Sequence, residues 1–187
     1  MELYLMRHPA VAVAAGICYG QTDVPPCAGY EELVRQAAAR LPDPTGLRVY
    51  SSPLRRCQVV ARMLADDGSP VTDPDLLELH FGDWENRPWS EIPRAQIDAW
   101  ADDFEHYPPP GGESVAAFLT RIRAFVARIR ERDEDCLVVG HTGWIRFLLA
   151  DLLEAPARAA FTLHIDFLGL SHVRLTPDTR KIMYINR

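Results

Sequence analysis

The sequence predicts an α/β protein, a three-layer α/β/α sandwich built on a mostly parallel central sheet. Short apolar runs alternate with longer segments of helical periodicity through most of the chain. Runs such as 3–6 and 136–139 are apolar throughout, as expected for strands buried on both faces. Together these observations favour a sheet with helices packed on both sides.

In the first part of the chain, a strand is expected over 3–6 and a loop over 9–28. A loop of that length within a compact domain is usually functional. A helix is expected over 30–41, where Pro42 and Pro44 stop the helical pattern.

A second strand is expected over 47–50. Pro53 suits the first turn of the helix that follows, which extends to about residue 65. Residues 71–72 can form a short strand, and the aromatic-rich segment 76–88 is typical of a loop.

In the second half, a helix is expected over 96–104, and the prolines and glycines of 108–112 break the chain. Apolar side chains between 115 and 129 fall on one face of a helix. A buried strand over 136–139 leads into a helix that Thr142 can cap.

That helix is expected to end at Leu153, and the last strands are expected over 161–175 and 181–185. These strands can pair antiparallel at an edge of the sheet. An exposed edge strand could also support a homodimer.

The composition fits one domain spanning residues 1–187, because the chain has 187 residues and 48% of them are hydrophobic. A net charge of -6 argues against a general nucleic-acid-binding protein. No apolar run approaches the roughly 20 residues that cross a membrane, and the amino terminus does not resemble a signal peptide. The four cysteines form no CxxC pair or zinc-ribbon pattern, which favours reduced thiols in a cytoplasmic protein.

Polar side chains follow three of the predicted strands. Arg7 and His8 end the first strand, Arg56 lies beyond the second, and His141 follows the strand over 136–139. Because open α/β sheets bind ligands beyond the carboxyl ends of their strands, we expect these side chains to converge. Arginine forks match phosphate oxygens and keep their charge, and the amides of the helix after His141 also favour an anion.

Two imidazoles beside arginines suit phosphoryl transfer. A neutral imidazole can attack phosphorus, and a second, protonated imidazole can bind the transferring oxygens. Structural use of such residues at the ends of buried strands is the plainer interpretation for each residue alone, and their combination favours function.

The chain resembles the histidine phosphatase superfamily, a phosphoglycerate-mutase-like group, from residue 3 to about 175. The motifs that carry the resemblance, in family order, are Leu5-Met6-Arg7-His8, Ser52-Pro53-Leu54-Arg55-Arg56, Glu78-Leu79-His80-Phe81-Gly82-Asp83-Trp84-Glu85, Gly112-Glu113-Ser114 and Val139-Gly140-His141-Thr142-Gly143. Within the superfamily the chain is most similar to the α-ribazole phosphatases of cobalamin synthesis. The resemblance implies a phosphomonoesterase that uses neither a metal nor a cofactor.

The resemblance also implies roles for single residues. His8 is the expected nucleophile that becomes phosphorylated, and Glu78 is the expected acid for the leaving alcohol and then base for water. The implied phosphate pocket consists of Arg7, Arg56, His141 and the backbone amide of Thr142.

Neighbouring residues receive weaker expectations. Arg55 is expected outside the pocket, and Glu113 and Ser114 are expected to border the site without taking part in the chemistry. Glu85 either acts in the site or braces its loop. Arg121 is expected on the solvated face of its helix.

The chain departs from the family pattern at two places. Pro9 replaces the usual glycine after the arginine–histidine pair, so no amide proton is available there. The asparagine that is common in the following loop is missing between Pro9 and Gly16. Either Gln21 or Thr22 takes its place, or the pocket is weaker.

Three alternatives to a phosphatase stay open. A phosphomutase would use the same phosphohistidine and a bisphosphate cofactor, and a phosphate-binding or scaffolding protein would keep the fold without the chemistry. A metal hydrolase is disfavoured because the chain has no close HxxxH or HxH pair. The expected partner is a small-molecule phosphate monoester, and both α-ribazole 5′-phosphate and a sugar phosphate are compatible with the residues.

Overall fold

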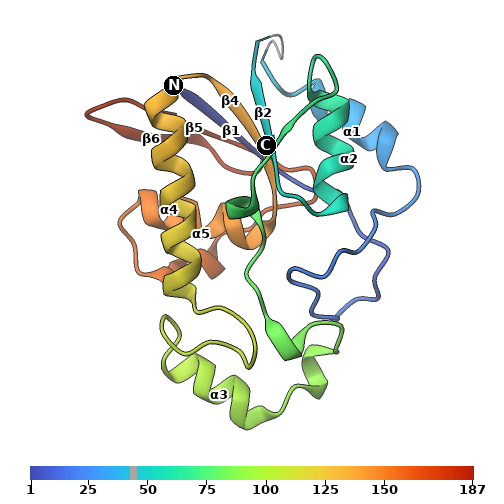
Figure 1. Cartoon of the computed structure of the whole chain (residues 1–187), viewed down its shortest axis with the longest axis vertical. Helices are drawn as coiled ribbons and strands as arrows, with labels where there is room; N and C mark the ends of the chain where they lie inside the picture. The colour runs from blue at the N-terminus through green and yellow to red at the C-terminus, as the bar shows by residue number, and fades with distance from the viewer. Residues whose placement is uncertain (43–45) are drawn as a thin grey trace.

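The computed structural model describes residues 1–42 and 46–187, so Pro44 lies outside the described residues. The six strands form one sheet in the order β3-β2-β4-β1-β5-β6. Their bounds are β1 Glu2–Arg7, β2 Arg48–Ser51, β3 Val71–Thr72, β4 Cys136–Gly140, β5 Leu170–Leu175 and β6 Arg180–Tyr184. Figure 1 shows α1 and α2 on one side of this sheet and α4 and α5 on the other, which confirms the predicted α/β sandwich.

The helices have the bounds α1 Tyr30–Ala38, α2 Arg55–Leu64, α3 Arg94–Asp102, α4 Val115–Arg132 and α5 Thr142–Leu152. Short 3-10 turns occupy Pro74–Leu76, Gly82–Trp84, Trp89–Glu91 and Ala157–Thr162. None of the helices in the described parts of the chain is both long and apolar enough to span a bilayer.

Strand β1 lies in the interior of the sheet. It pairs in parallel with β4 and antiparallel with β5, and β5 in turn pairs antiparallel with β6. The antiparallel edge expected from the sequence is therefore present. The other neighbours, β4 with β2 and β2 with β3, are parallel.

Two hydrophobic cores flank the sheet because successive strand side chains point to opposite faces. Leu3 and Leu5 pack with the apolar faces of α4 and α5. Tyr4 and Met6 pack with α1 and α2 on the other face. Continuous apolar strands are thus explained by burial on both sides.

The register of β1 and β4 positions the site. Arg7 lies opposite Gly140 in this parallel pair, so the next residues, His8 and His141, leave the sheet side by side. The backbone N–H of His8 donates to the carbonyl of Gly140 at 2.9 Å, which continues the pairing by one residue.

Three expected boundaries are wrong. Helix α2 begins at Arg55, because Leu54 has an extended backbone, so Pro53 precedes the helix instead of forming its first turn. Helix α5 begins at Thr142 and its N-cap residue is His141, so Thr142 does not cap it. Strand β5 is much shorter than the expected 161–175, because a turn with Leu168 at φ 57 interrupts the extended chain.

Candidate active site

His8 is buried, with 2% of its surface exposed, at the end of β1. Its Nδ1 lies 2.7 Å from the carbonyl oxygen of Pro9. A carbonyl oxygen can only accept, so Nδ1 carries the proton and Nε2 keeps a lone pair. Burial, together with the positive charge of Arg56, holds the pKa of His8 well below its usual range. The geometry therefore yields a neutral imidazole whose Nε2 keeps its lone pair.

His141 is fully buried beside His8. The two ring centroids are 5.3 Å apart with an interplanar angle of 63°. Arg56 donates from Nε to His141 Nδ1 at 3.3 Å, so the ring proton of His141 is on Nε2, which lies 2.8 Å from Ser52 Oγ. Burial and the charge of Arg56 hold the pKa of His141 well below its usual range.

The sequence led us to expect His141 in its protonated form. In the protein alone the ring is neutral, because burial and the nearby arginines disfavour a further positive charge. A phosphate dianion against this ring would act in the opposite direction and raise the pKa of His141.

Arg56 is fully buried at the start of α2. Its Nη1 donates to the carbonyl of Thr22 at 2.7 Å and its Nη2 to that of Gly20 at 2.6 Å. The guanidinium is therefore held between His141 and the loop that follows β1. Arg55, in contrast, is exposed, as expected.

Glu85 fixes this loop. Its carboxylate accepts hydrogen bonds from the backbone of Gln21 at 2.9 Å and from both the backbone and the hydroxyl of Thr22. Gly20 is required where the loop passes Glu85, since a Cβ there would overlap the carboxylate. These contacts agree with the expectation that Glu85 braces its loop, and not with a role in the chemistry.

Arg7 reaches the site from the end of β1. Its Nη1 donates to the carbonyl of Ile165 at 2.6 Å, and its guanidinium stacks on Phe167, 3.8 Å from the ring centroid. These partners come from the turn before β5, a segment for which the sequence predicts a strand.

Glu78 lies across the cavity from His8 and is 9% exposed. Its Oε2 accepts from the backbone N–H of Gly143 at 2.9 Å, and its Oε1 accepts from that of Leu79 at 3.0 Å. A Cβ at position 143 would overlap the Glu78 carboxylate, so the contact requires glycine. The two amides thus direct the carboxylate from the loop toward the start of α5.

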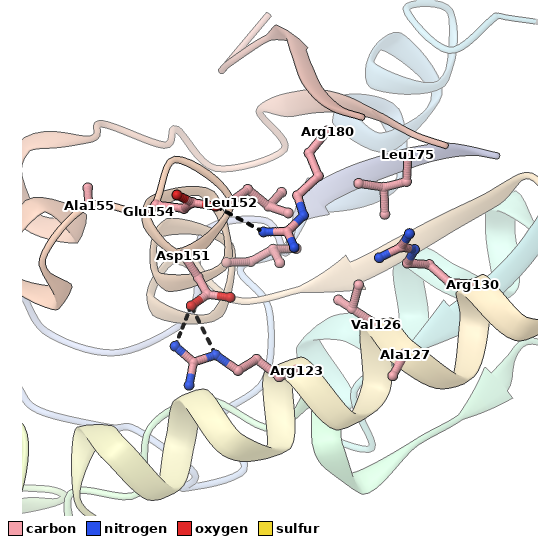
Figure 2. A pocket seen from close by; sticks show the side chains of 11 residues that line it. Arg123, Val126, Ala127, Arg130, Asp151, Leu152, Glu154, Ala155, Leu175 and Arg180 are labelled. Atoms are coloured by element: carbon pink, nitrogen blue, oxygen red, sulfur yellow. Dashed lines mark hydrogen bonds and ion pairs between the residues drawn. The ribbon is translucent and has the colours of Figure 1, made fainter. Parts of the chain in front are cut away.

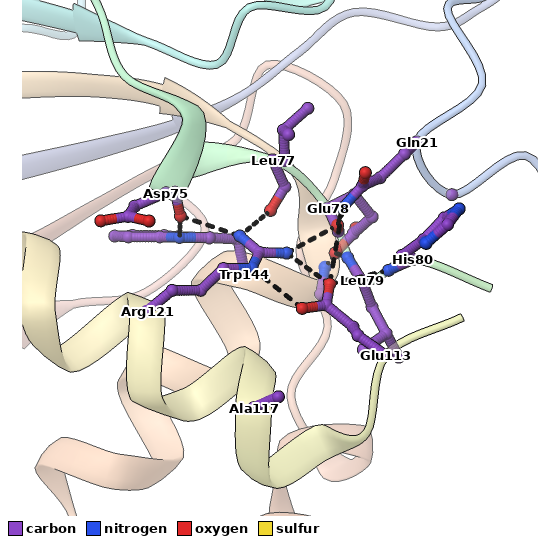
Figure 3. Close-up of polar contacts among 12 residues, drawn as sticks. Gln21, Asp75, Leu77, Glu78, Leu79, His80, Glu113, Ala117, Arg121 and Trp144 are labelled. Carbon is purple, nitrogen blue, oxygen red and sulfur yellow. Dashed lines mark hydrogen bonds and ion pairs between the residues drawn. The ribbon is translucent and has the colours of Figure 1, made fainter. Parts of the chain in front are cut away.

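The backbone beside Glu78 is anchored by Arg121 (Figure 3). Arg121 donates to the carbonyls of Leu77 at 2.6 Å and Glu78 at 2.8 Å, and it forms an ion pair with Glu113 at 2.6 Å. Only 17% of its side chain is exposed, so the expected place on a solvated helix face is wrong. The sequence does contain a signal for this position, because Arg121 follows Phe118 by three residues and therefore lies beside the apolar face of the helix. Its guanidinium carbon is 4.4 Å from the centroid of the Phe118 ring.

Glu113 and Ser114 both make structural hydrogen bonds at the border of the site. Ser114 caps α4 by accepting from the backbone of Ala117 at 3.2 Å. Glu113 also accepts from the backbone of His80 at 2.9 Å. These contacts agree with the expectation that both residues border the site without taking part in the chemistry.

Neither Gln21 nor Thr22 is free to replace the missing asparagine. The amide of Gln21 donates to the carbonyl of Glu78 at 2.9 Å, and the hydroxyl of Thr22 is bonded to Glu85 at 2.6 Å. Pro9 contributes its carbonyl to His8, which is a role that needs no amide proton.

A cavity of about 310 Å³ opens between His8 and Glu78. Many of the residues that line it are aromatic, and they include Tyr19, Phe81, Trp89, Trp100, Phe147 and Phe161. Thr142 also lines it, at the first turn of α5, where helix amides favour an anion. Of the six predicted site residues, His8, Glu78 and Thr142 line this cavity. His141 packs against His8, Arg56 is bonded to His141, and Arg7 precedes His8 in the chain.

A second hollow, of about 530 Å³, lies at the far end of α5 (Figure 2). Its Arg123 is paired with Asp151 at 2.5 Å, and its Arg130 donates to the carbonyl of Thr176 at 3.1 Å. It contains none of the predicted site residues.

The fold and this cavity define a histidine phosphatase. The model of the histidine phosphatase superfamily (branch 1) matches residues 3–187. The chain belongs to this superfamily, and it is a phosphatase.

Two relatives and one solved structure show which members of the superfamily the chain is similar to. The chain is 33% identical to the adenosylcobalamin/alpha-ribazole phosphatase of Escherichia coli (strain K12), over 89% of this chain and 86% of that protein. It is 32% identical to the probable phosphoglycerate mutase GpmB of Yersinia pestis (strain Pestoides F), over 92% and 84%. The crystal structure of the alpha-ribazole phosphatase from Shigella flexneri superimposes with a TM-score of 0.88 at 29% identity, covering 100% of this chain and 96% of that one.

Proposed function

We propose that the chain is a phosphomonoesterase that carries the phosphoryl group on Nε2 of His8. The observation that supports this most is the neutral His8 ring, whose Nδ1 is bonded to Pro9 and whose Nε2 keeps its lone pair. In the first step an N–P bond forms as the P–O bond to the alcohol breaks. In the second step water attacks phosphorus, and the N–P bond breaks to release phosphate and His8.

The proposed phosphate pocket surrounds this nitrogen. Arg7 and Arg56 supply fixed positive charge. Hydrogen bonds to backbone carbonyls hold both side chains in place, so they need not rearrange during the reaction. His141 donates from Nε2 to a phosphoryl oxygen in place of Ser52. The amide of Thr142 adds a donor at the first turn of α5.

Glu78 is the proposed proton carrier. It gives a proton to the leaving alcohol oxygen in the first step and takes one from water in the second. A purely phosphate-binding protein would have no use for a buried carboxylate held by two amides beside the nucleophile. This contact favours catalysis over the non-catalytic alternative.

α-Ribazole 5′-phosphate is the proposed substrate. The aromatic residues of the cavity lining offer flat apolar faces to a ring system on the leaving group. The relatives named for α-ribazole phosphate hydrolysis support this choice at about 30% identity. The second candidate is a mutase reaction, in which the phosphoryl group returns to the substrate, because one relative is named a probable phosphoglycerate mutase. Only that reaction would depend on an added bisphosphate.

The deciding experiment measures phosphate release from a panel of monoesters in the presence of EDTA, with His8→Ala alongside. The proposal expects EDTA-resistant release that disappears in His8→Ala and is inhibited by vanadate. Release that persists in His8→Ala would exclude the phosphohistidine route. Release of phosphate only when a bisphosphate is added would favour the mutase. The cytoplasmic location, the single domain and the homodimer expected from the sequence stay predictions.

A further inference from the structure

One face of α5 lines the cavity beyond the proposed phosphate pocket. Thr142, Gly143, Arg146 and Phe147 all contribute to this wall. Thr142 and Arg146 are four residues apart, so they lie one above the other, about 6 Å along the helix axis. Arg146 is therefore placed one helical turn farther from the pocket than the amides at the start of α5.

Arg146 differs from the other arginines of the site in its lack of partners. Its Nε is buried and has no hydrogen-bond partner in the part of the chain that the structure describes. The Nε of Arg7 is likewise buried and unpartnered within the described residues, but Nη1 of Arg7 and Nη1 of Arg56 are each held by a backbone carbonyl. The hydroxyl of Thr142 is also buried and unpartnered within the described residues. A buried donor without an acceptor costs free energy, which a ligand can recover by supplying one.

The cavity lining offers few side-chain acceptors for these donors. The rings of Trp100, Phe147 and Phe161, which also line it, have no oxygen or nitrogen acceptor, and Tyr19 contributes one hydroxyl. Glu78, the carboxylate of the lining, is already bonded to the amides of Leu79 and Gly143. Oxygen atoms of a bound molecule would therefore supply acceptors that this lining lacks.

We propose that Arg146, assisted by the hydroxyl of Thr142, binds oxygen atoms on the leaving group and selects esters whose alcohol carries them. The inference rests on the proposed function and specifies its substrate class. The ester carries either a carboxylate or a pair of neighbouring hydroxyls about one helical turn from the phosphorus. A guanidinium fork can engage two oxygens of either group at once.

The test compares kcat/KM for three esters in wild type, Arg146→Met and Thr142→Val. Phenyl phosphate has no oxygen on its leaving group beyond the bridging atom, ribose 5-phosphate carries neighbouring hydroxyls, and O-phosphoserine carries a carboxylate. Arg146→Met keeps an unbranched apolar stem and removes the charge and donors. The matched control is Arg62→Met, which removes the same charge from an exposed position on α2.

Arg146→Met is expected to lower kcat/KM for at least one oxygen-bearing ester about tenfold more than for phenyl phosphate, the size of a lost charge-assisted hydrogen bond. Thr142→Val is expected to act in the same direction by a smaller factor, and Arg62→Met is expected to leave the ratios unchanged. A selective loss with ribose 5-phosphate identifies the hydroxyls, and one with O-phosphoserine identifies the carboxylate. Equal losses on all three esters would overturn the inference and leave the proposed function standing. If wild type hydrolyses neither these esters nor α-ribazole 5′-phosphate, the proposed function itself fails.

Discussion

The backbone N–H of Gly143 donates a 2.9 Å hydrogen bond to Oε2 of Glu78. This contact joins the loop that carries the proposed acid to the first turn of α5, which carries the proposed phosphate pocket. The position of the carboxylate is therefore set by a helix as well as by its own loop.

Replacing Gly143 is expected to displace the proposed acid. A Cβ in Gly143→Ala would overlap the Glu78 carboxylate, and kcat should fall about 100-fold for an alkyl phosphate. Gly140→Ala is the matched control, because a Cβ there meets only a Val138 methyl at 3.9 Å. Steady-state kinetics of both variants checks this, and similar rates in the two would contradict the role of the contact.

Glu78→Gln is expected to discriminate between leaving groups. It should slow an alkyl phosphate by a factor of about 10² to 10⁴, the usual contribution of a general acid. p-Nitrophenyl phosphate should be slowed far less, since its leaving group needs little protonation. The measurement is kcat for both substrates at one pH, and equal slowing would count against the acid assignment.

His8→Ala is expected to lower turnover by at least about 10⁴-fold, as removal of a nucleophile does elsewhere. Rapid quench with a ³²P-labelled ester should give an acid-labile labelled protein in wild type and none in the variant. His141→Ala should nearly abolish turnover as well. His106→Ala is the control, because His106 is 73% exposed and far from these contacts. Label on His8→Ala would place the phosphoryl group elsewhere.

Stability is expected to fall as the pH drops below the ordinary histidine value near 6.5. The pKa values of His8 and His141 are held well below that value in the folded protein. Below it the unfolded chain binds protons that the folded chain does not, so the unfolding free energy decreases. Each such proton contributes roughly 1.4 kcal/mol per pH unit.

This pH effect can be assigned by chemical denaturation at pH 7.5, 6.0 and 5.0. His8→Gln should show a shallower loss than wild type over that range, because one of the two depressed pKa values is gone. The same steepness in both proteins would show that the buried histidines do not govern the dependence.

Arg121→Met is expected to lower the unfolding free energy by roughly 2–4 kcal/mol. It leaves the carboxylate of Glu113 and the carbonyl of Leu77 without their partner in a half-buried place. Arg128→Met, seven residues later on α4, removes ion pairs from a side chain that is 46% exposed. Its effect should be about 0–1 kcal/mol. Urea denaturation of both variants measures the difference, and equal losses would refute a special role for Arg121.

The sequence was sufficient to predict the layers and the convergence of the strand ends. Apolar runs reveal buried strands directly, and parallel strands bring Arg7, His8 and His141 to the same edge through a register that links Arg7 with Gly140. For this reason His8, which lines the cavity, lies beside His141.

The parts that could not be predicted depend on contacts distant in sequence. The carbonyl of Ile165 that holds Arg7 lies in an irregular turn with no periodic pattern, and the run of apolar residues around it resembled a strand. Likewise, the neutral state of His141 follows from its burial beside Arg56, which spacing in the sequence does not reveal. The prediction for Arg121 was wrong because it relied on the charge of arginine, which favours a solvated face. The spacing of three residues from Phe118 indicates the apolar side of the helix instead.

The interior position of β1 affects when this protein can become active during its synthesis. The proposed nucleophile leaves the ribosome well before the strands that flank β1, which are residues 136–140 and 170–175. A nascent chain therefore carries His8 on an unpaired apolar strand until those strands have been made. Such distant pairing slows folding and exposes the strand to aggregation, so newly made chains should depend on chaperones that shield β1.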